Sequence, residues 1–114
     1  FLIPHAGATL PLVADRVHAF SRLLAVDPAV DVLRDLGRLH FDLAGFPVPR
    51  QLDALLTLTT IEHLHYGSDY PFTPELVAAM AGERLAEAGD PPGSLPAALR
   101  SNTERLFPAL AHVR

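Results

Sequence analysis

The sequence contains one histidine and one aspartate that each follow a short apolar run and precede turn-forming residues. His5 follows the run 1–4 and precedes Ala6 and Gly7, and Asp69 lies in the segment Gly-Ser-Asp-Tyr-Pro at 67–71. An imidazole exchanges protons near neutral pH, and a carboxylate serves in acid/base chemistry or binds a divalent metal ion. Together they would form an acid/base and metal arrangement. The structural alternative is a histidine that caps a turn and an aspartate that holds a loop.

The elements that would position these two residues alternate along the chain. Apolar runs with strand character occupy 1–4, 39–43 and 61–66, and helical patterns occupy 10–26, 28–36, 49–58, 73–89 and 96–106. Asp27 before Pro28, and Thr73 before Pro74, predict helix N-caps followed by a first-turn proline. The alternation predicts an α/β fold with a parallel sheet and right-handed crossovers.

Chemistry in such folds lies at the carboxyl ends of the strands, which is where His5 and Asp69 fall. One strand would separate them, so their backbones would lie roughly 10 Å apart. Two side chains that point inward at that distance reach a shared water or metal ion.

Three further histidines invite a metal-site interpretation. His63 and His65 have the His-x-His spacing of a ligand pair, and a strand would place both on one face. However, His65 would lie ~13 Å along a straight strand from Asp69, so one ion could not bind both residues. We therefore interpret His40, His63 and His65 as packing or surface residues, with the ligand pair as the alternative.

The composition excludes several function classes. The chain has 114 residues, of which 49% are apolar and 19% charged, with a net charge of −4 and no cysteine. Disulfides, thiolate metal sites and a cysteine nucleophile are excluded. No basic stripe predicts nucleic-acid binding, and no apolar run reaches the ~20 residues of a membrane helix. We expect a cytoplasmic globular protein.

Three parallel strands need cover on both faces and partners at both edges. The chain also begins with Phe1, directly in a strand-like run. Both features predict that residues 1–114 form a single partial domain.

Four segments resemble one family of enzymes. They are IPHAGATLPL at 3–12, LHFD at 39–42, GSDYPF at 67–72 and SNTERLFP at 101–108. In this order they resemble the amidohydrolase-related family (amidohydrolase 2), which includes the aminocarboxymuconate-semialdehyde, γ-resorcylate and 6-methylsalicylate decarboxylases. Ala8 departs from the pattern, because the family usually has a second glycine there.

The resemblance implies a metal-dependent (β/α)8 barrel (a TIM barrel), of which this chain would be the C-terminal part, about strands 6–8. Asp69 would match the ligand of one divalent metal ion, Zn or Mn, and His5 the general acid/base beside it. Asn102 and Arg105 would tie the last helix to the barrel. The other metal ligands expected from the family are absent from this chain, so we expect the isolated chain to be inactive.

The resemblance leaves three functions open. One is non-oxidative decarboxylation of a small aromatic or unsaturated carboxylic acid, and another is hydrolysis of a lactone or amide. The third is a non-catalytic truncated fragment. Phe46 and Phe72 follow strand ends, where they would contact a small carboxylic acid substrate or anchor loops. We expect no nucleic-acid or membrane partner and no cofactor beyond the metal, and a homodimer stays open.

Overall fold

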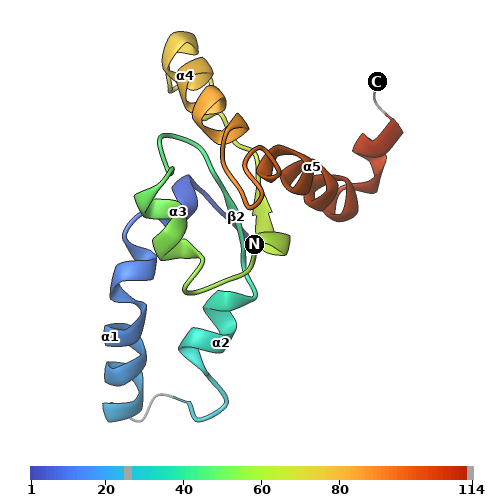
Figure 1. Ribbon diagram of the computed structural model, residues 1–114. Helices are drawn as coiled ribbons and strands as arrows, with labels where there is room; N and C mark the ends of the chain where they lie inside the picture. Colours follow the sequence, from blue (N-terminus) through green and yellow to red (C-terminus); the bar gives the residue numbers. More distant parts are fainter. Residues whose placement is uncertain (25–26, 113–114) are drawn as a thin grey trace.

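Three short parallel strands form the centre of the described part of the chain. The computed structural model describes residues 1–24 and 27–112. The strands β1 (Leu2–Ile3), β2 (His40–Asp42) and β3 (Leu64–His65) form one sheet in the order β1-β2-β3 (Figure 1). Both pairings are parallel, with Leu2 opposite His40 and Asp42 opposite His65. The predicted parallel α/β fold is confirmed.

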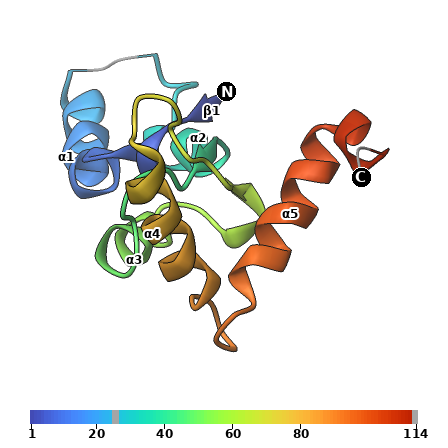
Figure 2. The same cartoon turned by 90° about the horizontal axis from the view of Figure 1, so that it is seen from above.

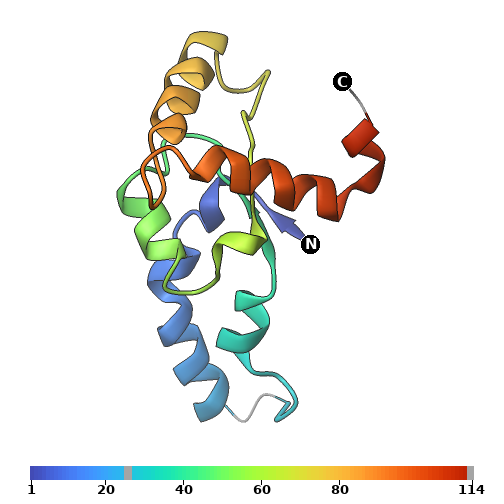
Figure 3. The same ribbon diagram turned by 45° about the vertical axis from the view of Figure 1, so that its right-hand side comes forward.

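Within residues 1–24 and 27–112, five α-helices and three 3-10 segments accompany this sheet. The helices are α1 (Leu10–Leu23), α2 (Val32–Gly37), α3 (Arg50–Leu55), α4 (Glu75–Ala86) and α5 (Leu95–Leu106), and the 3-10 segments are η1 (His5–Gly7), η2 (Ile61–His63) and η3 (Pro108–His112). Helices α1 and α2 contact each other at one end of the molecule, and α4 lies at the other. Helix α5 packs beside β3 and η2, as Figures 2 and 3 show from two sides.

The two faces of the sheet differ in character. Phe41 and Leu64 are paired in register and fully buried, and they join a core with Leu55 and Leu99. Because successive strand residues point to opposite faces, His40 and His65 lie on the other face. The sheet therefore packs one apolar face into the core and carries its polar residues on the second face.

The molecule is elongated for its size. Its radius of gyration is 15.5 Å and its extents are 49 × 31 × 29 Å, whereas a compact domain of 100 residues has a radius of gyration of about 13 Å. On α1, Leu12, Val17 and Phe20 are exposed. In the described part of the chain, β1 and β3 each pair on one side only. Sheet edges and apolar helix faces thus lack cover from within the described residues.

The prediction of a strand over 61–66 was wrong for its first half. Residues Ile61–His63 form the 3-10 turn η2, closed by the His63 amide, which donates to the Thr60 carbonyl at 3.1 Å. The Asn102 side chain holds the carbonyl of Ile61 at 2.6 Å. A tertiary hydrogen bond from α5 therefore overrides the local strand preference, and His63 and His65 do not share one strand.

The predicted start of the second helix was also wrong. The N-cap of α2 is Asp31, whose carboxylate accepts from the Arg34 amide at 3.1 Å. Asp27 accepts instead from the Ala29 amide at 2.9 Å, within a turn that suits an aspartate followed by proline. Helix α1 ends at Leu23, short of the predicted Val26, and residues 25–26 lie outside the described residues.

The predicted cap of the fourth helix has a different partner. Helix α4 begins at Glu75 after Pro74, with no side-chain cap. The Thr73 hydroxyl, expected as the cap, donates to the Asp69 carboxylate at 2.9 Å. This threonine therefore stabilises the loop that carries the candidate site and does not cap the helix.

Among the described residues, no helix combines the length and the hydropathy needed to cross a membrane.

Candidate active site

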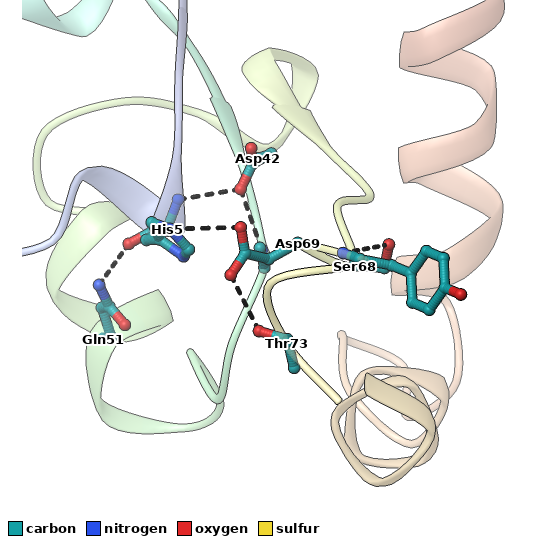
Figure 4. A network of polar contacts seen from close by, with 8 residues as sticks. His5, Asp42, Gln51, Ser68, Asp69 and Thr73 are labelled. Atoms are coloured by element: carbon teal, nitrogen blue, oxygen red, sulfur yellow. Dashed lines mark hydrogen bonds and ion pairs between the residues drawn. The ribbon is translucent and has the colours of Figure 1, made fainter. Parts of the chain in front are cut away.

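His5 lies two residues after the carboxyl end of β1 and begins η1. Its φ of 54° lies in the left-handed region, which non-glycine residues rarely adopt. Its amide donates to Oδ1 of Asp42 at 2.9 Å, and its carbonyl accepts from the side-chain amide of Gln51 (Figure 4). The backbone that carries the imidazole is thus held by side chains from two other parts of the chain.

Asp69 lies in the loop that follows β3. Its φ is 57°, a conformation that aspartate tolerates better than most residues. Thr73 holds it twice, because the Thr73 hydroxyl donates to Oδ2 and the Thr73 amide donates to the Asp69 carbonyl at 2.8 Å. These bonds leave Oδ1 of the carboxylate directed toward His5.

The two side chains meet at the rim formed by the carboxyl ends of the strands. Nε2 of His5 lies 3.9 Å from Oδ1 of Asp69, with side-chain exposures of 46% and 29%. Strand β2 lies between their two strands, as the sequence predicted. An exposed imidazole that faces a fixed carboxylate can accept or deliver a proton at Nε2 to a molecule bound between them.

A divalent metal ion finds only part of a ligand set here. Asp69 offers a carboxylate oxygen of the kind that Zn²⁺ and Mn²⁺ bind. Among the residues that the structure describes, no three histidine, aspartate or glutamate side chains are grouped so that they could hold an ion. The donor chemistry of Asp69 fits a metal, but the described chain supplies one ligand of the several that such an ion requires.

Asp42 and Gln51 belong to this site, and their roles were not predicted. Oδ1 of Asp42 accepts from the amides of His5 and Ala44, at 2.9 and 3.0 Å. Asp42 was visible as a polar residue at a strand end, which is a usable signal. Gln51 is a half-buried residue on α3 that carries no such signal in the sequence.

The two phenylalanines predicted to contact substrate differ in exposure and in their contacts. Phe46 is 44% exposed and carries the guanidinium of Arg84 over its ring, 5.5 Å from the centroid. Phe72 is 88% exposed. A cation over the ring indicates that Phe46 anchors its loop against α4, and substrate contact by either residue stays a prediction.

A hollow lies elsewhere on the described surface. It has a volume of about 470 Å³ and lies between α4 and α5, where Leu85, Leu99 and Thr103 are part of its lining. Neither His5 nor Asp69 lines it. His5 and Asp69 therefore lie outside this hollow, and their side chains are 46% and 29% exposed.

Three histidines form a second cluster of contacts. Nδ1 of His40 and Nε2 of His65 share a hydrogen bond of 2.8 Å, and Nδ1 of His65 bonds the Thr103 hydroxyl at 3.1 Å. The ring of His63 lies 5.0 Å from that of His40, and its Nδ1 is 2.9 Å from the Gly37 carbonyl. These contacts support the interpretation of the histidines as packing residues.

Burial and like charge act in the same direction on two of these histidines. Burial lowers the pKa of His40, and His63, the amino terminus and Arg105 lower it further. Burial also lowers the pKa of His65, with smaller contributions in the same direction from His40, Arg105 and His63 and an opposing one from Asp42. The folded protein therefore favours the neutral form of both rings.

Comparisons with known proteins place this fold in a family. No family model and no curated protein matches the chain. Among solved structures, an amidohydrolase II is 38% identical, with a TM-score of 0.80 over 92% of this chain and 34% of its own.

Two decarboxylases share the fold at lower identity. A 5-carboxyvanillate decarboxylase from Sphingomonas paucimobilis is 16% identical, with a TM-score of 0.72 over 94% of this chain and 33% of its own. A dihydroxybenzoic acid decarboxylase from Polaromonas sp., solved with manganese and the inhibitor 2-nitroresorcinol, is 15% identical, with a TM-score of 0.73 over 98% and 34%.

These matches define the class of the protein as an α/β chain built like part of a TIM-barrel amidohydrolase. The chain belongs to the amidohydrolase-related family, amidohydrolase 2. It spans about a third of the length of the solved structures that it matches.

Proposed function

We propose that this chain supplies His5 as general acid/base and Asp69 as metal ligand to a metal-dependent decarboxylase of small aromatic or unsaturated carboxylic acids. The observation that supports this most directly is the 3.9 Å approach of His5 Nε2 to Asp69 Oδ1 at the strand-end rim. In parallel α/β sheets this rim is where catalytic groups gather. The rim would correspond to about strands 6–8 of the barrel.

A divalent metal would bind the substrate carboxylate and withdraw charge from it. Asp69 would hold the ion together with ligands from outside the described residues, and Zn and Mn both suit a carboxylate. Thr73 would keep Asp69 Oδ2 occupied, so that Oδ1 stays available on the side of His5.

His5 would manage the proton in this reaction. The bond between the carboxyl carbon and the substrate carbon that bears it breaks. CO2 leaves, and the electron pair stays on the substrate carbon. Nε2–H of His5 delivers the proton to that carbon, and His5 regains a proton from solvent. The 46% exposure of its side chain gives it access to both the substrate and water.

Hydrolysis of a lactone or amide is the second candidate. It is favoured by the 38% identity to an amidohydrolase II, which exceeds the identity to the two decarboxylases. His5 would then take a proton from the attacking water and return it to the leaving group.

The test uses the longest natural polypeptide that contains this chain. It is loaded with Mn²⁺ or Zn²⁺ and given hydroxybenzoates labelled in the carboxyl carbon, and released labelled CO2 is counted. His5→Asn should lower kcat about 10²- to 10⁴-fold with metal content retained, and Asp69→Asn should lose both activity and bound metal. Asp15→Asn, at an exposed carboxylate on α1, is the control.

Two outcomes would contradict the proposal. Undiminished turnover by the His5→Asn protein would remove the proton role. Ring opening of a lactone without release of labelled CO2 would favour the hydrolase. In parallel, metal analysis of the isolated 114-residue chain should give far less than one ion per chain. Stoichiometric metal with turnover that Asp69→Ala abolishes would show a complete site in this chain alone.

A further inference from the structure

The backbone of His5 is held from both sides by side chains that are distant in sequence. Its amide donates to Oδ1 of Asp42 at 2.9 Å, and Nε2 of Gln51 donates to its carbonyl. Asp42 is the last residue of β2 and Gln51 lies in the first turn of α3. Figure 4 shows these two partners around His5, whose ring is turned toward Asp69.

This arrangement counters a conformational preference of the chain. The φ values of His5 and Ala6 are 54° and 51°, and that of Ala8 is 50°. Non-glycine residues persist in this region only where their surroundings fix them. A free segment would return to negative φ, and the direction of the His5 side chain would change with it.

Asp42 is itself fixed in place. Its Oδ1 accepts a second bond from the Ala44 amide at 3.0 Å. Gly67 lies so close that a Cβ there would come within 2.8 Å of Asp42 Cγ and 2.9 Å of Asp42 Cβ. The carboxylate is thus confined between the ends of β1, β2 and β3. Because it bonds the His5 amide, the position of His5 depends on how these strand ends are arranged.

Gln51 holds the other end of the same turn. Its Nε2 donates to the carbonyl of His5 and, at 3.4 Å, to the carbonyl of Ala8. One amide group therefore bridges the first and last residues of the left-handed segment. Both contacts require a donor, which an amide provides and a carboxylate does not.

We propose that Asp42 and Gln51 are positioning residues that fix the left-handed backbone of His5 and so keep its Nε2 facing Asp69. We call the contacts of Asp42 and Gln51 with the His5 backbone the clamp. The proposal rests on the proposed function only in giving His5 a catalytic role, because the clamp itself is a property of the chain. Neither residue touches the reacting atoms. Asp42 must accept a hydrogen bond and Gln51 must donate one, which predicts different outcomes for closely matched variants.

The test begins with NMR spectroscopy of the chain without metal or substrate. Positive φ at His5 gives a strong NOE between its own amide and Hα protons, and the hydrogen bond slows exchange of its amide. Asp42→Ala should weaken this NOE and speed exchange of the His5 amide about tenfold. Asp42→Asn keeps an oxygen acceptor and should preserve both signals.

Gln51 is tested by a variant that keeps its shape. Gln51→Glu removes the donor and places a carboxylate against two carbonyl groups, so the His5 NOE should weaken. Asp53→Ala, an exposed residue on the same helix, should leave it unchanged. Since Gln51 is only half-buried, this variant decides the question if Asp42→Ala fails to fold.

Unchanged His5 signals in Gln51→Glu, or equal loss in Asp42→Asn and Asp42→Ala, would overturn the clamp. In the longest natural polypeptide, Gln51→Glu should lower kcat with KM retained, and Asp42→Asn should rescue the loss seen with Asp42→Ala. The two proposals fail separately, because the NMR signals need no catalysis. An inactive enzyme with an intact clamp would contradict only the proposed function.

Discussion

Nδ1 of His40 and Nε2 of His65 lie 2.8 Å apart on neighbouring strands, and the second ring continues to the Thr103 hydroxyl on α5. This hydrogen bond needs one N–H donor and one unprotonated nitrogen. If both rings were protonated, two donors and two positive charges would face each other. The link from β2 through β3 to α5 therefore depends on at least one neutral ring.

The first prediction is a loss of stability in mild acid. The pKa of both rings is lowered in the folded protein, chiefly by burial. The unfolded chain then binds more protons just below pH 6.5, so the stabilising contribution is complete above that value and is lost as the pH falls through the folded-state pKa values. Each histidine contributes a slope of at most about 1.4 kcal/mol per pH unit. Urea titrations from pH 8 to 5 measure it.

Replacing one ring isolates this effect. His65→Leu removes a titrating group, and we expect a shallower dependence of unfolding free energy on pH between 6.5 and 5. An equally steep dependence in His65→Leu would assign the acid sensitivity to other groups.

The second prediction concerns Asn102, which is 5% exposed. Its Nδ2 donates to the carbonyls of Ile61 and Leu64, at 2.6 and 3.0 Å, and Arg105 donates to its Oδ1 at 3.0 Å. Asn102→Ala leaves two carbonyls without this donor. Each group that stays buried and unpaired lowers the free energy of unfolding by about 1–3 kcal/mol. Urea unfolding should show a loss of about 2 kcal/mol or more.

The neighbouring exposed residue provides the control for Asn102. Ser101→Ala should change the unfolding free energy by less than about 0.5 kcal/mol. In Asn102→Ala, amide hydrogen exchange should also speed up more around residues 61–65 than in α1. A uniform effect along the chain would mean that Asn102 stabilises the whole fold and not this junction in particular.

The third prediction compares two glycines with opposite expected signs. At Gly67 an added Cβ would meet Asp42 Cγ at 2.8 Å, whereas at Gly82, inside α4, it would meet nothing within 4 Å. Gly67→Ala should destabilise by about 1–3 kcal/mol, because either the strand or the carboxylate must shift. Gly82→Ala should stabilise by about 0.5–1 kcal/mol through helix propensity. Thermal unfolding of the two variants measures both signs, and a neutral Gly67→Ala would show that the carboxylate of Asp42 moves freely.

The sequence was sufficient for the order of the strands and for the meeting of His5 and Asp69. Both follow from chain order, since parallel strands with right-handed crossovers bring their carboxyl ends to one edge. The links through Asn102, Arg105 and the carbonyl of Glu62 also agree with the expected tie of the last helix.

The remaining features depend on contacts between distant residues. Ile61 and His63 have strand character locally, but Asn102, from another helix, captures the Ile61 carbonyl and favours the 3-10 turn. Gln51 reaches the His5 carbonyl from a helix that carries no pattern for this role. The choice of helix cap is a local exception, because Asp27 accepts from the Ala29 amide in a turn and Asp31 accepts from the Arg34 amide at the start of α2.

The last prediction concerns Thr73, whose hydroxyl donates to Oδ2 of Asp69 at 2.9 Å. Thr73→Val keeps the shape and removes the donor, so the unfolding free energy should fall by about 1 kcal/mol. Thr73→Ser should retain most of it, because the donor remains. Thr57→Val is a matched control, since that hydroxyl donates to the Ala54 carbonyl at an exposed position and should matter by less than about 0.5 kcal/mol. If Thr73→Val and Thr57→Val lose equal stability in urea, the bond to Asp69 contributes nothing specific, and the carboxylate is held by its backbone alone.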